Sequence, residues 1–166
     1  MMLKSIILFS SILFITGCLK TVPTVPEDYT GPKSSISDSV QYIDGGKADF
    51  FYVSHINGNK IKDSRSESLS ASYGNGNNLT TRIMHNSVPV QKQIFTIVGR
   101  TTYAMPIREI IGKGYLVEGD IEFTPEESKG YRVTGLLSKD GSSVWIEDVS
   151  NGEIIVRKIE KIKAPN

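Results

Sequence analysis

Hydrophobic and polar residues alternate in short runs along residues 36–166, and turn-forming residues separate these runs. A period of two predicts half-buried β-strands, whereas a helix repeats its apolar positions every three or four residues. In the clearest run, residues 115–124, one face carries Tyr115, Val117, Ile121 and Phe123, and the other carries the acids Glu118, Asp120 and Glu122. We expect these acids to face solvent. The other strands are expected at about residues 37–43, 50–56, 80–86, 93–98, 131–137, 143–149 and 153–160.

Three dipeptides predict tight turns between neighbouring strands: Asn57-Gly58, Asp140-Gly141 and Asn151-Gly152. Asparagine, aspartate and glycine tolerate the positive φ angles that such turns require. The last two turns place the final three strands in an antiparallel meander. One short helix is expected at residues 106–111, where Pro106 suits a helix start and Gly112 a helix end.

Together these elements predict an all-β domain over residues 36–166. The expected fold is an antiparallel two-layer β-sandwich of about seven or eight strands with at most one short helical turn. A closed β-barrel is the alternative. A domain of this length buries a hydrophobic core without help from disulfides.

The N-terminal residues follow a different pattern. Lys4 precedes an apolar stretch of about a dozen residues that ends in small residues. This arrangement is typical of a secretory signal, and the stretch is too short for a transmembrane helix, which needs roughly 20 residues. The tetrad Ile15-Thr16-Gly17-Cys18 resembles the lipobox of bacterial lipoproteins. The resemblance implies that residues 1–17 are a signal peptide and that Cys18 becomes the lipid-bearing first residue.

Cys18 is the only cysteine of the chain, so lipidation would also account for the lone thiol of an exported protein. The resemblance implies that covalent lipid on Cys18 joins the protein to a membrane, and two or three acyl chains would hold it stably. In Gram-negative lipoproteins an Asp after the modified Cys favours the inner membrane, and here Leu19 follows. We therefore expect an outer-membrane anchor with the domain facing the periplasm, or the cell membrane in a Gram-positive organism.

Residues 18–35 predict an extended tether, because Pro23, Pro26 and Pro32 disfavour a helix. In a polyproline-like form the tether would hold the domain up to about 50 Å from the bilayer. Removal of the signal peptide, which contains Lys4, leaves 18 basic and 18 acidic side chains. This balance argues against a nucleic-acid partner.

Two stretches resemble known envelope modules. Residues 123–133 join two strands through an acidic turn, which is similar to transthyretin-like and immunoglobulin-like periplasmic domains. The strand at residues 143–148, with Trp145, resembles one in a group of uncharacterised proteobacterial lipoproteins. The resemblance covers about residues 88–156. It implies a sandwich fold and carries no catalytic residue with it.

No pattern in the sequence predicts an active site. His55 and His85 do not belong to a ligand-spaced cluster, and no Gly-x-Ser-x-Gly motif presents a serine nucleophile. We therefore expect no catalytic, cofactor-binding or metal-binding residues. A glycine- and asparagine-rich loop is the candidate recognition surface, because tyrosine and asparagine are frequent contact residues in loops. Its candidate residues are Tyr73, Asn75, Asn77 and Asn78.

These observations predict a lipid-anchored envelope protein whose β-sandwich is a non-enzymatic binding or scaffold module. The expected partner is another envelope protein or a cell-wall component. One alternative is an accessory lipoprotein subunit of an envelope-spanning machine of the secretion type. Another is an enzyme or enzyme inhibitor with a site on the end loops, which a pocket uniting His55 or His85 with carboxylates would favour.

Overall fold

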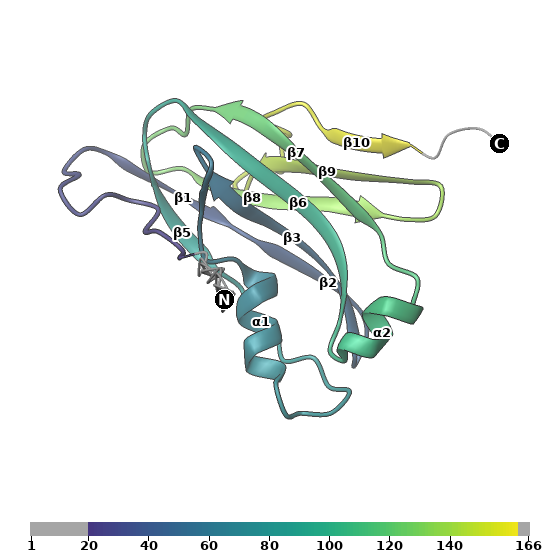
Figure 1. Ribbon diagram of the computed structural model, residues 1–166. Helices are drawn as coiled ribbons and strands as arrows, with labels where there is room; N and C mark the ends of the chain where they lie inside the picture. The colour runs from purple at the N-terminus through teal and green to yellow at the C-terminus, as the bar shows by residue number, and fades with distance from the viewer. Residues whose placement is uncertain (1–19, 163–166) are drawn as a thin grey trace, which may run out of the picture.

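The computed structural model describes residues 20–162, so the predicted signal peptide and Cys18 lie outside the described residues. In this part of the chain two five-stranded sheets pack face to face, and they do not close into a barrel (Figure 1). The predicted all-β sandwich is confirmed. Sheet A has the order β10 (Ile159–Ile162), β9 (Gly141–Asp148), β8 (Gly130–Leu137), β1 (Lys33–Ser37) and β5 (His85–Pro89). Sheet B has the order β2 (Ser39–Asp44), β3 (Lys47–Ile56), β6 (Gln93–Tyr103) and β7 (Leu116–Phe123), with β4 (Asn59–Lys60) paired to β3.

The main hydrophobic core lies between the two sheets. Phe123 of β7 packs edge-on against Tyr131 of β8, with 4.8 Å between the ring centroids. The alternation predicted for residues 115–124 is confirmed, because its apolar face is buried from Val117 to Phe123 and its three acids are exposed. The completely buried side chains of this core include Phe51, Val53, Phe95, Ile97, Val133, Val144 and Ile146.

At Asp38 one extended segment passes from sheet A to sheet B. β1 pairs in parallel with β8 up to Ser37, and β2 pairs with β3 from Ser39 onward. The single strand predicted at residues 37–43 is therefore two strands in different sheets. Side chains continue the contact with β8 where the backbone turns away. Ser37 Oγ, Ser39 Oγ and Gln41 Nε2 donate to the carbonyl oxygens of Tyr131, Val133 and Gly135, respectively.

Two of the three predicted turns form hairpins. Asn57-Gly58 joins β3 to β4 with φ angles of 51° and 76°, as its composition predicted. The turn at Asp140-Gly141 joins β8 to β9. Directly after Asn151-Gly152 the chain makes one isolated bridge to β9, between Ile154 and Glu147, and it then leaves β9 before pairing with it again in β10. The third strand of the meander, β10, therefore begins at Ile159 rather than near residue 153.

A helix that the apolar pattern did not predict, α1 (Ser64–Ser72), lies on the outer face of sheet B (Figure 1). The expectation of at most one helical turn is wrong, because α2 (Pro106–Ile111) is also present as predicted. The buried positions of α1 are all serines, so its helical period is invisible to hydrophobicity. The strand expected at residues 80–86 begins only at His85, because the preceding residues pair with these serines.

The predicted tether is shorter than residues 18–35. Val22 N donates to Lys60 O over 2.9 Å, Thr24 Oγ1 donates to Ser87 O over 2.6 Å, and β1 already begins at Lys33. Residues 21–25 therefore lie along the domain and connect the edges of β4 and β5. The four residue steps from Cys18 to Val22 span at most about 14 Å, much less than the predicted length of about 50 Å.

The paired strands β3 and β6 define two ends of sheet B. At the end that we call the anchor end, Ile56 pairs with Phe95 close to β4 and the Val22–Lys60 hydrogen bond. At the other, the helical end, Lys47 pairs with Tyr103 and α2 follows. The strand from Phe95 to Tyr103 covers about 26 Å at the usual rise per residue.

Candidate functional site

The loop predicted as a recognition surface lies at the helical end, between α1 and the segment that leads to β5. Tyr73 is 93% exposed and has no contact that would hide its ring. Asn75 stabilises the loop, since its Nδ2 donates to Ala71 O and Thr80 Oγ1 over 3.2 Å each. Asn77 Oδ1 accepts from Arg108 of α2 over 3.3 Å, and Asn78 lies beside Gly45. The structure thus brings the loop next to α2.

The base of this loop is held by a ladder of serine hydroxyls on α1. Residues four apart on a helix are about 6.0 Å apart along its axis, and alternate residues of an extended chain are about 6.6 Å apart. Serines at every fourth position of α1 can therefore accept from every second N–H of residues 80–84. The three bonds run from Thr80 N to Ser72 Oγ (2.8 Å), Arg82 N to Ser68 Oγ (2.7 Å) and Met84 N to Ser64 Oγ (2.7 Å).

Asp38 links the start of α1 to the point where the chain passes from sheet A to sheet B. Its Oδ2 accepts from the N–H and the hydroxyl of Ser64 over 2.9 and 2.7 Å, and its Oδ1 accepts from Val53 N over 3.1 Å. Burial raises the pKa of the Asp38 carboxyl to about 7, although these hydrogen bonds oppose the shift. One buried carboxyl therefore connects β2, β3 and α1.

The helix α2 presents its apolar side chains outward. No residue of α2 is buried, and its three isoleucines, Ile107, Ile110 and Ile111, are 54%, 79% and 76% exposed. Its acid points inward instead: Glu109 Oε1 accepts from Arg65 Nη2 over 2.9 Å and from Arg100 Nη2 over 2.6 Å. A helix on the surface of a globular protein normally buries its apolar stripe. Here charged hydrogen bonds hold the inner face, and the apolar face has no partner within residues 20–162.

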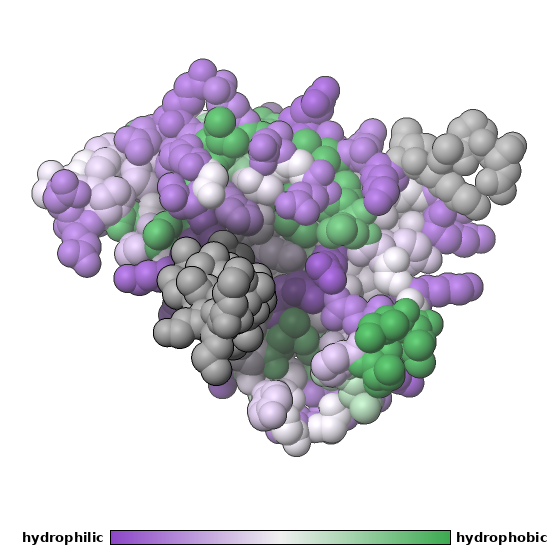
Figure 2. All heavy atoms as spheres, in the orientation of Figure 1, coloured by the Kyte–Doolittle hydropathy of each residue, from purple (hydrophilic) through white to green (hydrophobic). Residues whose placement is uncertain are grey.

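The exposed isoleucines lie at the same end of the domain as several other exposed large side chains, and we call this set the helical-end surface. Figure 2 shows hydrophobic side chains gathered over α2. Three segments contribute to this surface: the end of β2, the predicted loop, and α2 with the residue before it. Its members are Tyr42, Ile43, Tyr73, Met105, Ile107, Ile110 and Ile111. Exposed apolar side chains that gather in this way, as the isoleucines of α2 do, often mark a contact with another molecule.

Backbone contacts fix the three segments relative to one another. Leu79 N donates to Gly45 O over 2.8 Å, and Ala104 N donates to Gly46 O over 2.9 Å. A side chain at position 46 would clash, because its Cβ would lie 2.4 Å from Asn77 O. The Gly45-Gly46 turn thus allows the loop and the start of α2 to approach β2. The helical-end surface is a built feature of the fold.

The histidines are not part of this surface or of an acid–base cluster. His55 Nδ1 lies 3.0 Å from Ser54 Oγ on β3, and His85 is exposed at the start of β5. Within residues 20–162 no group of three or more histidine, cysteine or acidic side chains is arranged to hold a metal ion. None of the helices in these residues is long and apolar enough to cross a membrane.

No protein family, no curated protein and no solved structure matches this chain. The candidate site therefore rests on the geometry of the chain itself.

The sequence predicts the loop as a candidate surface, but it does not predict that the neighbouring helix α2 exposes its apolar side chains. Residues 106–111 were predicted as a helix from Pro106 and Gly112, yet hydrophobicity alone does not tell which face of a short helix is buried. A weak signal was present, because α2 carries three isoleucines in six residues with a single acid among them. Only the contacts of Glu109 with Arg65 and Arg100 decide that the isoleucines face outward.

Proposed function

We propose that this protein is a lipid-anchored, non-enzymatic binding module of the bacterial envelope, and that it contacts a partner protein through the helical-end surface. The observation that carries the proposal is the inverted arrangement of α2, with Glu109 bonded to the sheet and three isoleucines in solvent. The exposed fractions of the three isoleucines add up to about two fully exposed isoleucine side chains. Covering them would contribute roughly 3–6 kcal/mol to an association.

The positions of the two ends support this arrangement. The lipobox resemblance places the anchor at Cys18, and the bond from Val22 to Lys60 then keeps the anchor end within about 14 Å of the lipid-bearing residue. The helical end lies about 26 Å further along β6. A domain attached in this way presents its apolar surface at the end remote from its attachment, where a partner in the periplasm can reach it.

Photo-crosslinking in living cells tests the proposed surface. A photoreactive amino acid at Ile110 should give a discrete adduct with a partner protein, because this side chain is the most exposed of the three isoleucines of α2, at 79%. The matched control is Ile94, which is 45% exposed on β6 at the anchor end. Adducts from position 110 and none from position 94 are expected.

A second variant relates the adduct to the apolar face. Ile107→Glu should abolish crosslinking from position 110, since it buries a charge in any apolar interface formed there. The proposal is contradicted if position 110 yields no adduct, or if positions 94 and 110 yield the same adducts.

A further inference from the structure

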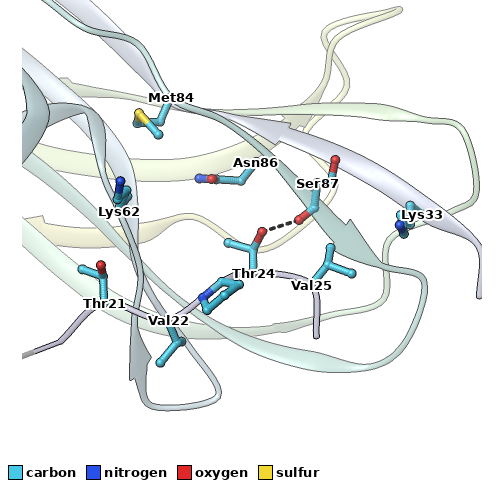
Figure 3. A pocket seen from close by; sticks show the side chains of 10 residues that line it. Thr21, Val22, Thr24, Val25, Lys33, Lys62, Met84, Asn86 and Ser87 are labelled. Atoms are coloured by element: carbon cyan, nitrogen blue, oxygen red, sulfur yellow. Dashed lines mark hydrogen bonds between the residues drawn. The ribbon is translucent and has the colours of Figure 1, made fainter. Parts of the chain in front are cut away.

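A pocket of about 470 Å³ opens beside residues 21–25 at the anchor end, between these residues and β5 (Figure 3). Val22, Pro23, Val25 and Met84 supply apolar walls, and threonine, serine, asparagine and lysine supply the polar ones. No acidic residue of the described chain lines the pocket. Its volume is within the range usual for sites that bind small molecules.

Three hydrogen-bond donors of this pocket, the ammonium groups of Lys33 and Lys62 and the Nδ2 of Asn86, have no charged or hydrogen-bonded partner in the described residues. Lys33 and Lys62 lie on opposite sides of it (Figure 3), and neither makes an ion pair within residues 20–162. Asn86 projects between them from β5. Its Nδ2 is buried and is the one buried side-chain nitrogen or oxygen in the described part of the chain without a hydrogen-bond partner. Buried donors are nearly always satisfied, so an unpaired one calls for an acceptor.

We propose that this pocket binds the phosphate of an anionic phospholipid headgroup in the membrane that carries the Cys18 anchor. Lysine ammonium groups and an amide N–H₂ are donors of the kind that phosphate oxygens accept from, and the apolar walls suit the first carbons of the lipid below the headgroup. The location agrees with this ligand, because Thr21 and Val22 line the pocket and lie only three and four residues after Cys18. The choice of a lipid as the source of the phosphate rests on the proposed anchor.

Such a contact would orient the domain. A lipid anchor alone leaves a protein free to rotate about a short linker, whereas a second bond to a headgroup fixes one face against the bilayer. In this protein the fixed face is the anchor end. The helical-end surface would then point away from the membrane.

Nuclear magnetic resonance of the side-chain amide of Asn86 tests the site. The processed full chain, extracted in uncharged detergent, is titrated separately with dihexanoyl phosphatidylglycerol, dihexanoyl phosphatidylcholine and inorganic phosphate. We expect the Asn86 N–H₂ signals to shift and saturate with phosphatidylglycerol, at lower concentration than with the other two. Lys33→Gln and Lys62→Gln should each weaken binding about fivefold. Lys139→Gln, an exposed lysine beside the distant β8–β9 turn, is the control and should leave binding unchanged.

Three results of these titrations would overturn the proposal. Unshifted Asn86 signals would mean that the pocket does not hold phosphate, and equal binding of inorganic phosphate would mean that the ligand is the free anion. Unaltered affinity in both lysine variants would remove the charge argument. The anchor is judged separately from the mass of the same sample: an unlipidated chain that still binds phosphatidylglycerol would refute the anchor and leave the pocket standing.

Discussion

Replacement of Asp38 by asparagine should remove a specific dependence of folding stability on pH. Asp38 is 3% exposed, and burial raises its pKa from the ordinary value of 3.8 to about 7. The folded protein therefore binds a proton at this carboxyl more tightly than the unfolded chain does. The stabilisation from this proton is complete below about pH 4, and it is lost as the pH rises toward 7.

The size of the effect follows from the pKa shift. One pKa unit corresponds to about 1.4 kcal/mol, so a shift of about three units makes the wild type lose up to about 4 kcal/mol of stability between about pH 4 and about pH 8. The asparagine side chain of the variant does not ionise and has no such loss. The amide N–H₂ of the variant can come to lie opposite Val53 N, which destabilises the fold. This loss is the same at every pH, so it lowers the free energy of unfolding of the variant without changing its dependence on pH.

The assay is urea denaturation of wild type and Asp38→Asn over the range from about pH 4 to about pH 8. The free energy of unfolding of the variant, relative to wild type, should rise with pH by roughly 3–4 kcal/mol. Burial also raises the pKa of Asp49, but this carboxyl is unchanged in both proteins and cancels in the difference. The exposed Asp28→Asn is the control and should give a flat difference. A flat or falling difference for Asp38→Asn would mean that its three donors keep the carboxylate ionised, contrary to the raised pKa.

Three further substitutions test the packing. Ser68→Ala should lower the free energy of unfolding by about 1–3 kcal/mol, because it leaves the N–H of Arg82 without its acceptor. The control Ser70→Ala, at an exposed position of α1, should change it by less than about 0.5 kcal/mol, and equal effects of the two in chemical denaturation would contradict the serine ladder. Gly135→Ala should lower the free energy of unfolding by at least about 3 kcal/mol or prevent folding, since its Cβ would lie 2.2 Å from Ser143 O. The control Gly114→Ala, whose Cβ has its nearest neighbour at 3.7 Å, should fold normally, and a wild-type thermal melt for Gly135→Ala would refute the close approach. Glu109→Gln should speed amide hydrogen exchange in residues 107–112 about tenfold, because it removes the charge that Arg65 and Arg100 bind, and unchanged exchange would show that other contacts hold α2.

Strands could be predicted from the sequence wherever one face of the sheet is apolar and the other polar. Residues 115–124 are the clearest example, and the Asn57-Gly58 hairpin shows that turn chemistry is equally local. The division of residues 37–43 into two strands was not predictable in this way. It depends on which strand each half meets, and on a buried Asp38 that takes the place of a backbone partner.

The helix α1 shows the limit of hydrophobic patterns. Serine is a weak helix former, and the buried face of α1 consists of serines, so neither propensity nor apolar period predicts it. The helix exists because Asp63 caps its start and because residues 80–84 supply N–H groups at the matching spacing. The loop at residues 73–78 was predictable as a loop from its glycine and asparagine content. Its neighbour α2 was predictable as a helix but not as an exposed apolar surface.

The intact mass of the protein extracted from membranes is the decisive test of the proposed lipid anchor. We expect a chain that begins at Cys18 and carries a diacylglyceryl group on sulfur, commonly with a further acyl group on the new amino terminus. Cys18→Ser should remove these lipids and release the protein from the membrane fraction. A wild-type chain that retains residues 1–17, or one that is cut elsewhere and carries no lipid, would contradict the proposal.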